Sequence, residues 1–146
     1  MIKVVWTVLC SQSVIDQTTN NISLFQVLEE VQLDIKKKTD KEKQLIQIPF
    51  AFQWVTLWEN MRDKKSTSSV KDIVVSPTGK TVFESKEYEI NLLARKRHRF
   101  IRTFAGLPLE ESGRYEFRTQ LRAKEENVWT DAASVPLQVV IRVEAT

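Results

Sequence analysis

The chain has 146 residues, of which 42% are hydrophobic and 28% charged, and its formal net charge is +3. This size and composition predict a single domain over residues 1–146 and exclude a disordered chain. Because Cys10 is the one cysteine, the chain cannot form an internal disulfide or build a zinc or iron–sulfur site from cysteines alone. We therefore expect a cytoplasmic protein, and no run of about 20 apolar residues predicts a membrane span.

The N-terminal residues alternate apolar and polar side chains, which is the pattern of a half-buried strand. The apolar residues of one parity are Ile2, Val4, Trp6, Val8 and Cys10. The pattern predicts that this side of the strand faces the core, so Trp6 is expected to be a core residue.

Residues 22–35 fit a strand or a helix. The turn-forming sequence QTTNN before them and their β-branched content favour the strand. In a strand, Glu29 would share the inward parity of Phe25, Val27 and Val31, where a carboxylate needs a partner. We expect a bulge that turns Glu29 outward.

Residues 46–58 predict another strand with aromatic enrichment, although a helix over residues 50–61 also fits the spacing. Pro49 cannot donate to a strand ladder, so it is expected at an edge, at a bulge or at a position without a ladder bond. Residues 72–85 predict a hairpin that turns at Pro77-Thr78-Gly79.

Two stretches near the C-terminus alternate most regularly. The first stretch has the apolar-side residues Tyr115, Phe117, Thr119, Leu121 and Ala123, and the second has Val135, Leu137, Val139, Ile141 and Val143. With the earlier elements, they indicate an all-β fold: a two-sheet antiparallel sandwich of about seven to nine strands.

The segment LPLEESGRYEF places Tyr115 and Phe117 inward after a turn. This pattern resembles the tyrosine corner of immunoglobulin-like sandwiches, in which the tyrosine hydroxyl bonds back to the upstream backbone. Phe117 stands where antibody domains have their second cysteine.

A second resemblance covers nearly the whole chain. The segments VVWTVLC, ISLFQVLEEV, RHRFIRTFAGLPLEESGRYEFRTQL and VPLQVVIRV resemble an uncharacterised bacterial family of small cytoplasmic proteins. The resemblance implies a sandwich fold without implying an activity.

The sequence predicts no catalytic residue, no metal site and no cofactor. His98, the one histidine, lies among Arg95, Lys96, Arg97 and Arg99, whose positive charges repel a metal ion. No nucleophile elbow, HExxH helix or phosphate-cradling glycine loop occurs in the sequence. We therefore expect that the protein is not an enzyme.

Basic residues and one aromatic residue define a candidate binding surface. Arg114, Arg118, Arg122 and Lys124 share the outward side of one predicted strand, and Arg95, Arg97, Arg99 and Arg102 come shortly before it. Trp129 lies in a loop-like stretch, where it is expected to close the sandwich end or anchor a partner. The candidate residues are Arg97, Arg99, Arg114, Arg118, Arg122 and Trp129.

Three functions fit these features. The leading hypothesis is a non-catalytic binding or assembly module with a protein partner, and edge strands are also compatible with a homodimer. A nucleic-acid binder that uses the basic strand face is the second hypothesis, although the aromatic residues expected in the core would not stack on bases. A carboxylate-based hydrolase is the third hypothesis. The basic strand face also fits an ordinary salt-bridged surface that binds no ligand.

Overall fold

The computed structural model describes residues 1–36, 46–123 and 126–144. Within these residues it has twelve strands and no helix, so the all-β prediction is confirmed and the helices considered for residues 22–35 and 50–61 are not formed. The strands are β1 (Ile2–Ile15), β2 (Ile22–Val27), β3 (Glu30–Lys36), β4 (Ile46–Gln47), β5 (Phe52–Asn60), β6 (Ser66–Val75), β7 (Thr81–Glu84), β8 (Tyr88–Leu92), β9 (Arg97–Phe104), β10 (Pro108–Leu109), β11 (Gly113–Ala123) and β12 (Thr130–Glu144). The described residues thus form more strands than the seven to nine expected.

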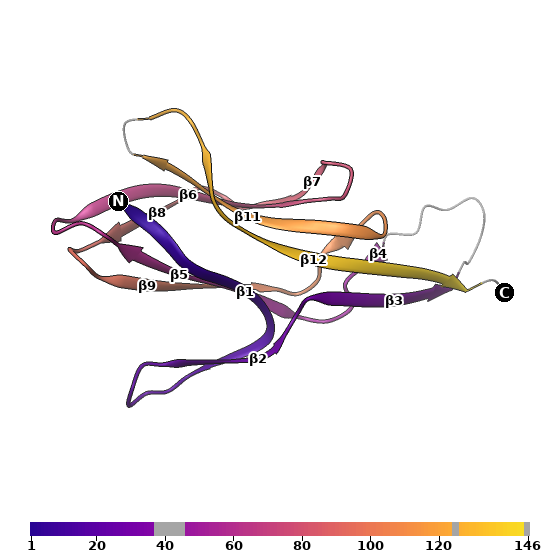
Figure 1. Ribbon diagram of the computed structural model, residues 1–146. Helices are drawn as coiled ribbons and strands as arrows, with labels where there is room; N and C mark the ends of the chain where they lie inside the picture. The colour runs from indigo at the N-terminus through magenta and orange to yellow at the C-terminus, as the bar shows by residue number, and fades with distance from the viewer. Residues whose placement is uncertain (37–45, 124–125, 145–146) are drawn as a thin grey trace.

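The strands form two larger sheets and one small sheet (Figure 1). One larger sheet has the order β2-β1-β5-β9, and Figure 1 shows its strand β1 strongly bent toward β2; we call it the curled sheet. The other has the order β3-β12-β11-β6-β7, with β8 also paired to β6; we call it the six-stranded sheet. Among the described residues, β3 and β12 pair in parallel, which departs from the purely antiparallel arrangement expected.

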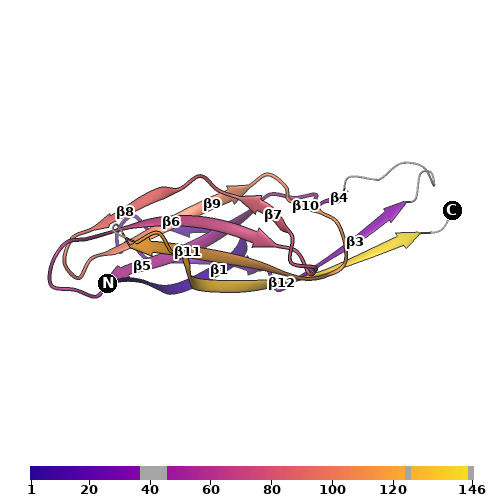
Figure 2. The ribbon, with the colours of Figure 1, turned by 90° about the horizontal axis from the view of Figure 1, so that it is seen from above.

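Apolar side chains from the two larger sheets meet between them in a sandwich-like core. The rings of Phe52, Trp54 and Phe104 from the curled sheet lie between 5.2 and 6.1 Å from that of Phe117 in the six-stranded sheet. A second apolar cluster contains Trp58 and Val70. Figure 2 shows an elongated molecule in which the ends of β3 and β12 extend past the other strands.

The regular alternation near the C-terminus is confirmed in its central part. Tyr115, Phe117 and Thr119 of β11 are buried, as are Leu137 and Val139 of β12. Their polar neighbours lie on the other face of the same sheet. Period-two burial therefore identified both the strands and the side that packs on the core.

The single parity predicted for the N-terminal strand is wrong, because β1 has a bulge between Val4 and Trp6. Ile2 is buried in the core before the bulge, and Leu9 is a core residue after it. The extra residue reverses the side on which later residues lie. Trp6 is consequently half-buried on the side of the curled sheet that faces away from the core.

Residues 22–35 form two strands of different sheets, β2 and β3, with a break at Leu28 and Glu29. Glu29 is exposed as expected, but through this break rather than through a bulge within one strand. Phe25 and Val27, which were expected to face inward, are each 51% exposed. The change of sheet explains the ambiguous pattern, since one inward parity cannot hold across two sheets.

The two proline predictions are confirmed. Pro49 lies in a bend outside the strand ladder, and this bend divides the strand predicted over residues 46–58 into β4 of the small sheet and β5 of the curled sheet. The β6–β7 hairpin turns over Pro77 to Gly79, where Gly79 has a φ of 90° and the Ser76 N–H donates to the Lys80 carbonyl at 2.7 Å. A positive φ of this kind favours glycine.

Candidate functional site

The predicted arginine surface is divided in two, because β9 and β11 belong to different sheets. Arg97 and Arg99 lie on β9, an outer strand of the curled sheet. Arg114, Arg118 and Arg122 lie on β11, inside the six-stranded sheet. The structure therefore does not join the first pair to the other three, and each group has its own surroundings.

The arginines of β11 are paired with carboxylates. Glu116 lies between Arg114, at 3.6 Å, and Arg118, at 2.8 Å. Arg122 pairs at 3.1 Å with Glu87, the residue directly before β8. Lys124, which was expected to extend this stripe, lies outside the described residues. The face is thus an array of ion pairs rather than a row of free positive charges.

Trp129 lies on the same face as Arg122. The Arg122 guanidinium is 5.0 Å from the ring centroid and the Lys71 ammonium is 4.7 Å from it. Such cation–π contacts already use the indole face. Trp129 therefore packs against cations of this sheet.

Arg102 departs from the expected basic surface, because it points between the two sheets. Its Nη2 lies 3.0 Å from Asp72 Oδ2, and the Asp72 side chain is only 4% exposed. Tyr88 Oη donates to the same carboxylate at 3.0 Å, and Thr119 Oγ1 donates to Oδ1 at 3.0 Å. Burial, and then the Asp72 charge, raises the pKa of the Tyr88 hydroxyl.

We missed this polar network in the sequence, although a signal was present. Arg102 has the parity of Phe100 and Phe104, and Asp72 has the parity of Val70 and Val74. Opposite charges at inward-facing positions of two strands predict a buried ion pair, because an unpaired buried charge is costly. The network has a structural role between the sheets, and no part of it reaches the groove described next.

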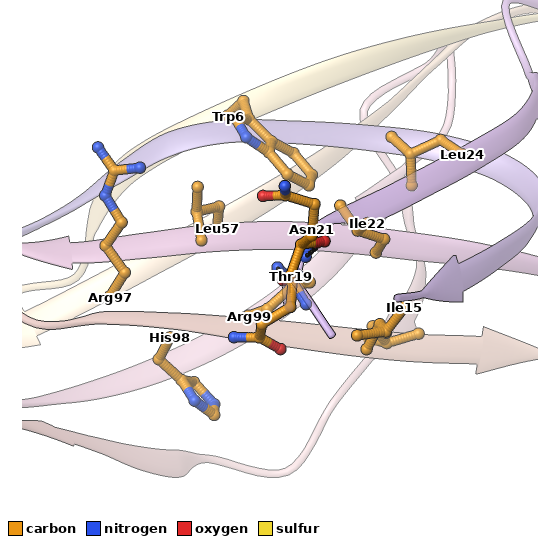
Figure 3. A pocket seen from close by; sticks show the side chains of 12 residues that line it. Trp6, Ile15, Thr19, Asn21, Ile22, Leu24, Leu57, Arg97, His98 and Arg99 are labelled. Carbon is orange, nitrogen blue, oxygen red and sulfur yellow. Dashed lines mark hydrogen bonds between the residues drawn. The ribbon is translucent and has the colours of Figure 1, made fainter. Parts of the chain in front are cut away.

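The curled sheet forms an open groove on its side away from the core (Figure 3). The groove has a volume of about 830 Å³ and lies between the β1–β2 hairpin and the strands β5 and β9. Its apolar lining consists of Trp6, Ile15, Ile22, Leu24, Leu57 and Ile101. The β1 bulge is the local cause, since it places Trp6 in this groove.

The groove also has a cationic side formed by Arg97 and Arg99, and His98 lines it between them. Arg97 Nε lies 3.2 Å from Glu59 Oε1, so its charge is partly offset. Arg99 Nη2 donates to the Asn20 carbonyl at 2.9 Å, and its buried Nε has no hydrogen-bond partner among the described residues. Because no described lining residue is acidic, the groove has an unbalanced positive charge.

The tip of the β1–β2 hairpin is held in place by its own hydrogen bonds. Asp16 Oδ1 accepts from the N–H groups of Thr18 at 2.8 Å and Thr19 at 2.9 Å, which lowers the pKa of Asp16. Asn20 has a φ of 60°, and its carbonyl reaches Arg99 of β9. The hairpin tip and the outer strand are thereby joined across the groove.

The remaining candidate chemistry is sparse in the described part of the chain. Cys10 is buried, and this burial raises the pKa of its thiol. Over residues 1–36, 46–123 and 126–144, no three His, Cys, Asp or Glu side chains cluster as metal ligands would. The same residues contain no helix of the length and apolarity that crossing a membrane requires.

Comparison with protein-family models and with curated proteins finds no match for this chain.

Proposed function

We propose that this chain is a non-catalytic, cytoplasmic binding or assembly module on a two-sheet immunoglobulin-like sandwich, and that it holds a protein partner in the groove of the curled sheet. The main support is the groove itself, with a volume of about 830 Å³ and a wall of apolar side chains that includes the half-buried Trp6. Binding sites commonly combine apolar walls with a few polar groups that fix orientation. A half-buried tryptophan is also a frequent anchor in protein interfaces.

The charges of the groove favour a partner segment with apolar side chains and a carboxylate. Arg99 has a guanidinium that no described carboxylate neutralises, whereas Arg118 is already paired with Glu116. A carboxylate can accept charge-assisted hydrogen bonds from a guanidinium, and complementary charge also speeds association. Arg97 and Arg99 thus remain in the proposed surface, and Arg114, Arg118, Arg122 and Trp129 do not.

A pair of charge-reversed variants tests this proposal. Partners are captured from native extract with the wild-type chain, identified, and then bound as purified proteins to Arg99→Glu and to the double variant Arg118→Glu/Arg122→Glu. We expect Arg99→Glu to raise the dissociation constant at least about tenfold, which corresponds to loss of a charged hydrogen bond. The double variant on β11 should leave the dissociation constant unchanged. If the double variant weakens binding and Arg99→Glu does not, the partner binds to the face of β11 and not to the groove.

A photoreactive residue in place of Leu57 gives a geometric check, because this side chain lines the groove. The proposal requires that it crosslinks to the partner and that a photoreactive residue in place of exposed Gln138 on β12 does not. Equal crosslinking from both positions would exclude the groove as the specific site.

Nucleic-acid binding is supported by one observation, namely that Trp6 lies beside Arg97 and Arg99 rather than in the core. Phosphate contacts would make the affinity fall steeply with salt. A single-stranded oligonucleotide that fails to shift in a gel at low ionic strength would exclude this second function.

A further inference from the structure

We infer that a second pocket, at the end of the molecule where the β5–β6 turn meets the start of β1, binds the phosphate group of a small phosphorylated molecule. The pocket has a volume of about 650 Å³ and is separate from the groove. Residues 62–68, with the sequence RDKKSTS, supply its polar side. Figure 1 shows the N-terminus beside this turn, and the Met61 N–H donates to the Met1 carbonyl at 2.9 Å.

The backbone of the turn is held by the buried side chain of Asn60. Its Nδ2 donates to the carbonyls of Lys64 at 2.8 Å, Leu92 at 3.1 Å and Leu93 at 3.1 Å. Its Oδ1 accepts from the Arg62 N–H at 3.0 Å. Because Asn60 is fully buried, the turn that carries the cations has a defined backbone before any ligand binds.

The cations of the turn are free to meet an anion. Arg62, Lys64 and Lys65 line the pocket, and within the described residues none of them makes an ion pair. The acid of the turn, Asp63, is bound instead to Arg95 Nε at 2.8 Å. Among the described lining side chains Glu126 is the acidic one, so three cationic side chains and one carboxylate leave an excess of two positive side-chain charges.

Ser66, one of the lining residues, has a buried hydroxyl without a partner among the described residues. Its neighbour Thr67, by contrast, is bonded to Asn91 at 3.0 Å. A buried hydroxyl without a partner is uncommon and costly. A rotation of the Ser66 side chain about χ1 would turn the hydroxyl toward a phosphate oxygen, which would accept bonds from Ser66 and from the lysines at the same time.

The opposite wall of the pocket is apolar, with contributions from Ile2, Leu121 and Ala123. Small-molecule sites commonly have volumes of about 300–1,000 Å³ and combine such a wall with a few polar groups. A phosphate monoester with a compact apolar group fits both sides, whereas inorganic phosphate satisfies only the polar side.

Titrations followed by the backbone amide NMR signals of residues 62–68 test this inference. The probes are inorganic phosphate and phenyl phosphate, in a zwitterionic buffer at low ionic strength. We expect saturable shifts with both, with tighter binding of phenyl phosphate. The variants Lys64→Gln/Lys65→Gln and Ser66→Ala should each raise the dissociation constant about tenfold, as loss of a charged hydrogen bond predicts.

Lys3→Gln is the matched control, because Lys3 is an exposed cation of β1 that does not line this pocket. It should leave the titration unchanged. Absence of saturable shifts, or equal effects of Lys3→Gln and Ser66→Ala, would overturn the inference. Binding of a single-stranded oligonucleotide without binding of phenyl phosphate would overturn it in favour of a nucleic-acid surface. Each result is independent of the groove and of its protein partner.

Discussion

The interior between the sheets and the outer face of β11 contain arginine–carboxylate pairs of the same chemistry in opposite surroundings. Arg102 lies 3.0 Å from Asp72, and Arg118 lies 2.8 Å from Glu116. The Asp72 side chain is 4% exposed, whereas that of Glu116 is 31% exposed. The shorter pair is thus the more hydrated one, so distance alone does not rank the two interactions.

The difference lies in what surrounds each carboxylate. Asp72 also accepts hydrogen bonds from Tyr88 and Thr119, and the Arg102 guanidinium lies 5.2 Å from the Phe100 ring centroid. Removing either charge leaves the other one without its ion-pair partner where water has limited access, whereas water can replace either partner on the β11 face. We therefore expect the interior to be sensitive to substitution and the β11 face to tolerate it.

The largest expected effect follows from Asp72→Ala. The variant leaves the Arg102 charge uncompensated between the sheets and removes the acceptor of Tyr88 and Thr119. We expect a loss of about 3–5 kcal/mol in the free energy of unfolding, measured by urea denaturation. A loss below about 1 kcal/mol would remove the contrast between the two regions.

The double variant Asp72→Leu/Arg102→Met is the control for Asp72→Ala. Replacing a buried ion pair by apolar residues of similar size is often neutral, so much of the lost stability should return. A double variant as unstable as Asp72→Ala would assign the effect to altered packing rather than to the isolated charge.

The same contrast explains how much the sequence could predict. Alternation identified β11 correctly, since Tyr115, Phe117 and Thr119 are buried in a strand without a break over this stretch. It failed for Trp6, because a bulge reverses parity without a glycine or proline to mark it. A bulge depends on pairing with β5, which a single-sequence pattern does not contain.

The groove was unpredictable for a similar reason. It requires the bulge in β1, the curl of the sheet and contact between Asn20 and Arg99, which are 79 residues apart. The arginines themselves were found correctly as candidates, but sequence proximity grouped Arg99 with Arg114. Strand order, which separates β9 from β11, is a property of the tertiary fold.

Tyr115→Phe sharpens the comparison with a buried group that has no charge. Tyr115 Oη donates to the Glu111 carbonyl at 2.8 Å and accepts from the N–H groups of Glu110 and Glu111 at 3.2 Å each, which confirms the predicted back-bonding. Loss of these bonds should lower the free energy of unfolding by about 1–3 kcal/mol, less than Asp72→Ala. Chemical denaturation of both variants in parallel measures the order, and a reversed order would show that charge burial is not the dominant cost.

Alkaline pH should weaken the interior next. Burial, and then the Asp72 charge, raises the pKa of Tyr88 in the folded protein. Above the ordinary tyrosine pKa of about 10, the unfolded chain loses this proton while the folded chain keeps it, so the stability falls as pH rises. By pH 11 the loss attributable to Tyr88 is about 1 kcal/mol.

Tyr88→Phe isolates this contribution, because phenylalanine has no proton to lose. The slope of unfolding free energy against pH between about 10 and 11 should be smaller in the variant than in the wild type. Identical slopes would show that Tyr88 does not keep its proton in the folded state.

The smallest expected effect is that of Arg118→Gln on the β11 face. The substitution breaks the bond to Glu116, but Glu116 keeps Arg114 at 3.6 Å and access to water, so the loss should be below about 1 kcal/mol. Added salt should reduce the difference between the wild type and the variant, because salt screens the exposed pair that only the wild type has. A loss in unfolding free energy as large as that of Asp72→Ala would contradict this prediction. The exposed ion pairs of β11 would then stabilise the protein as strongly as the buried pair, and solvent exposure would not explain a difference between the two regions.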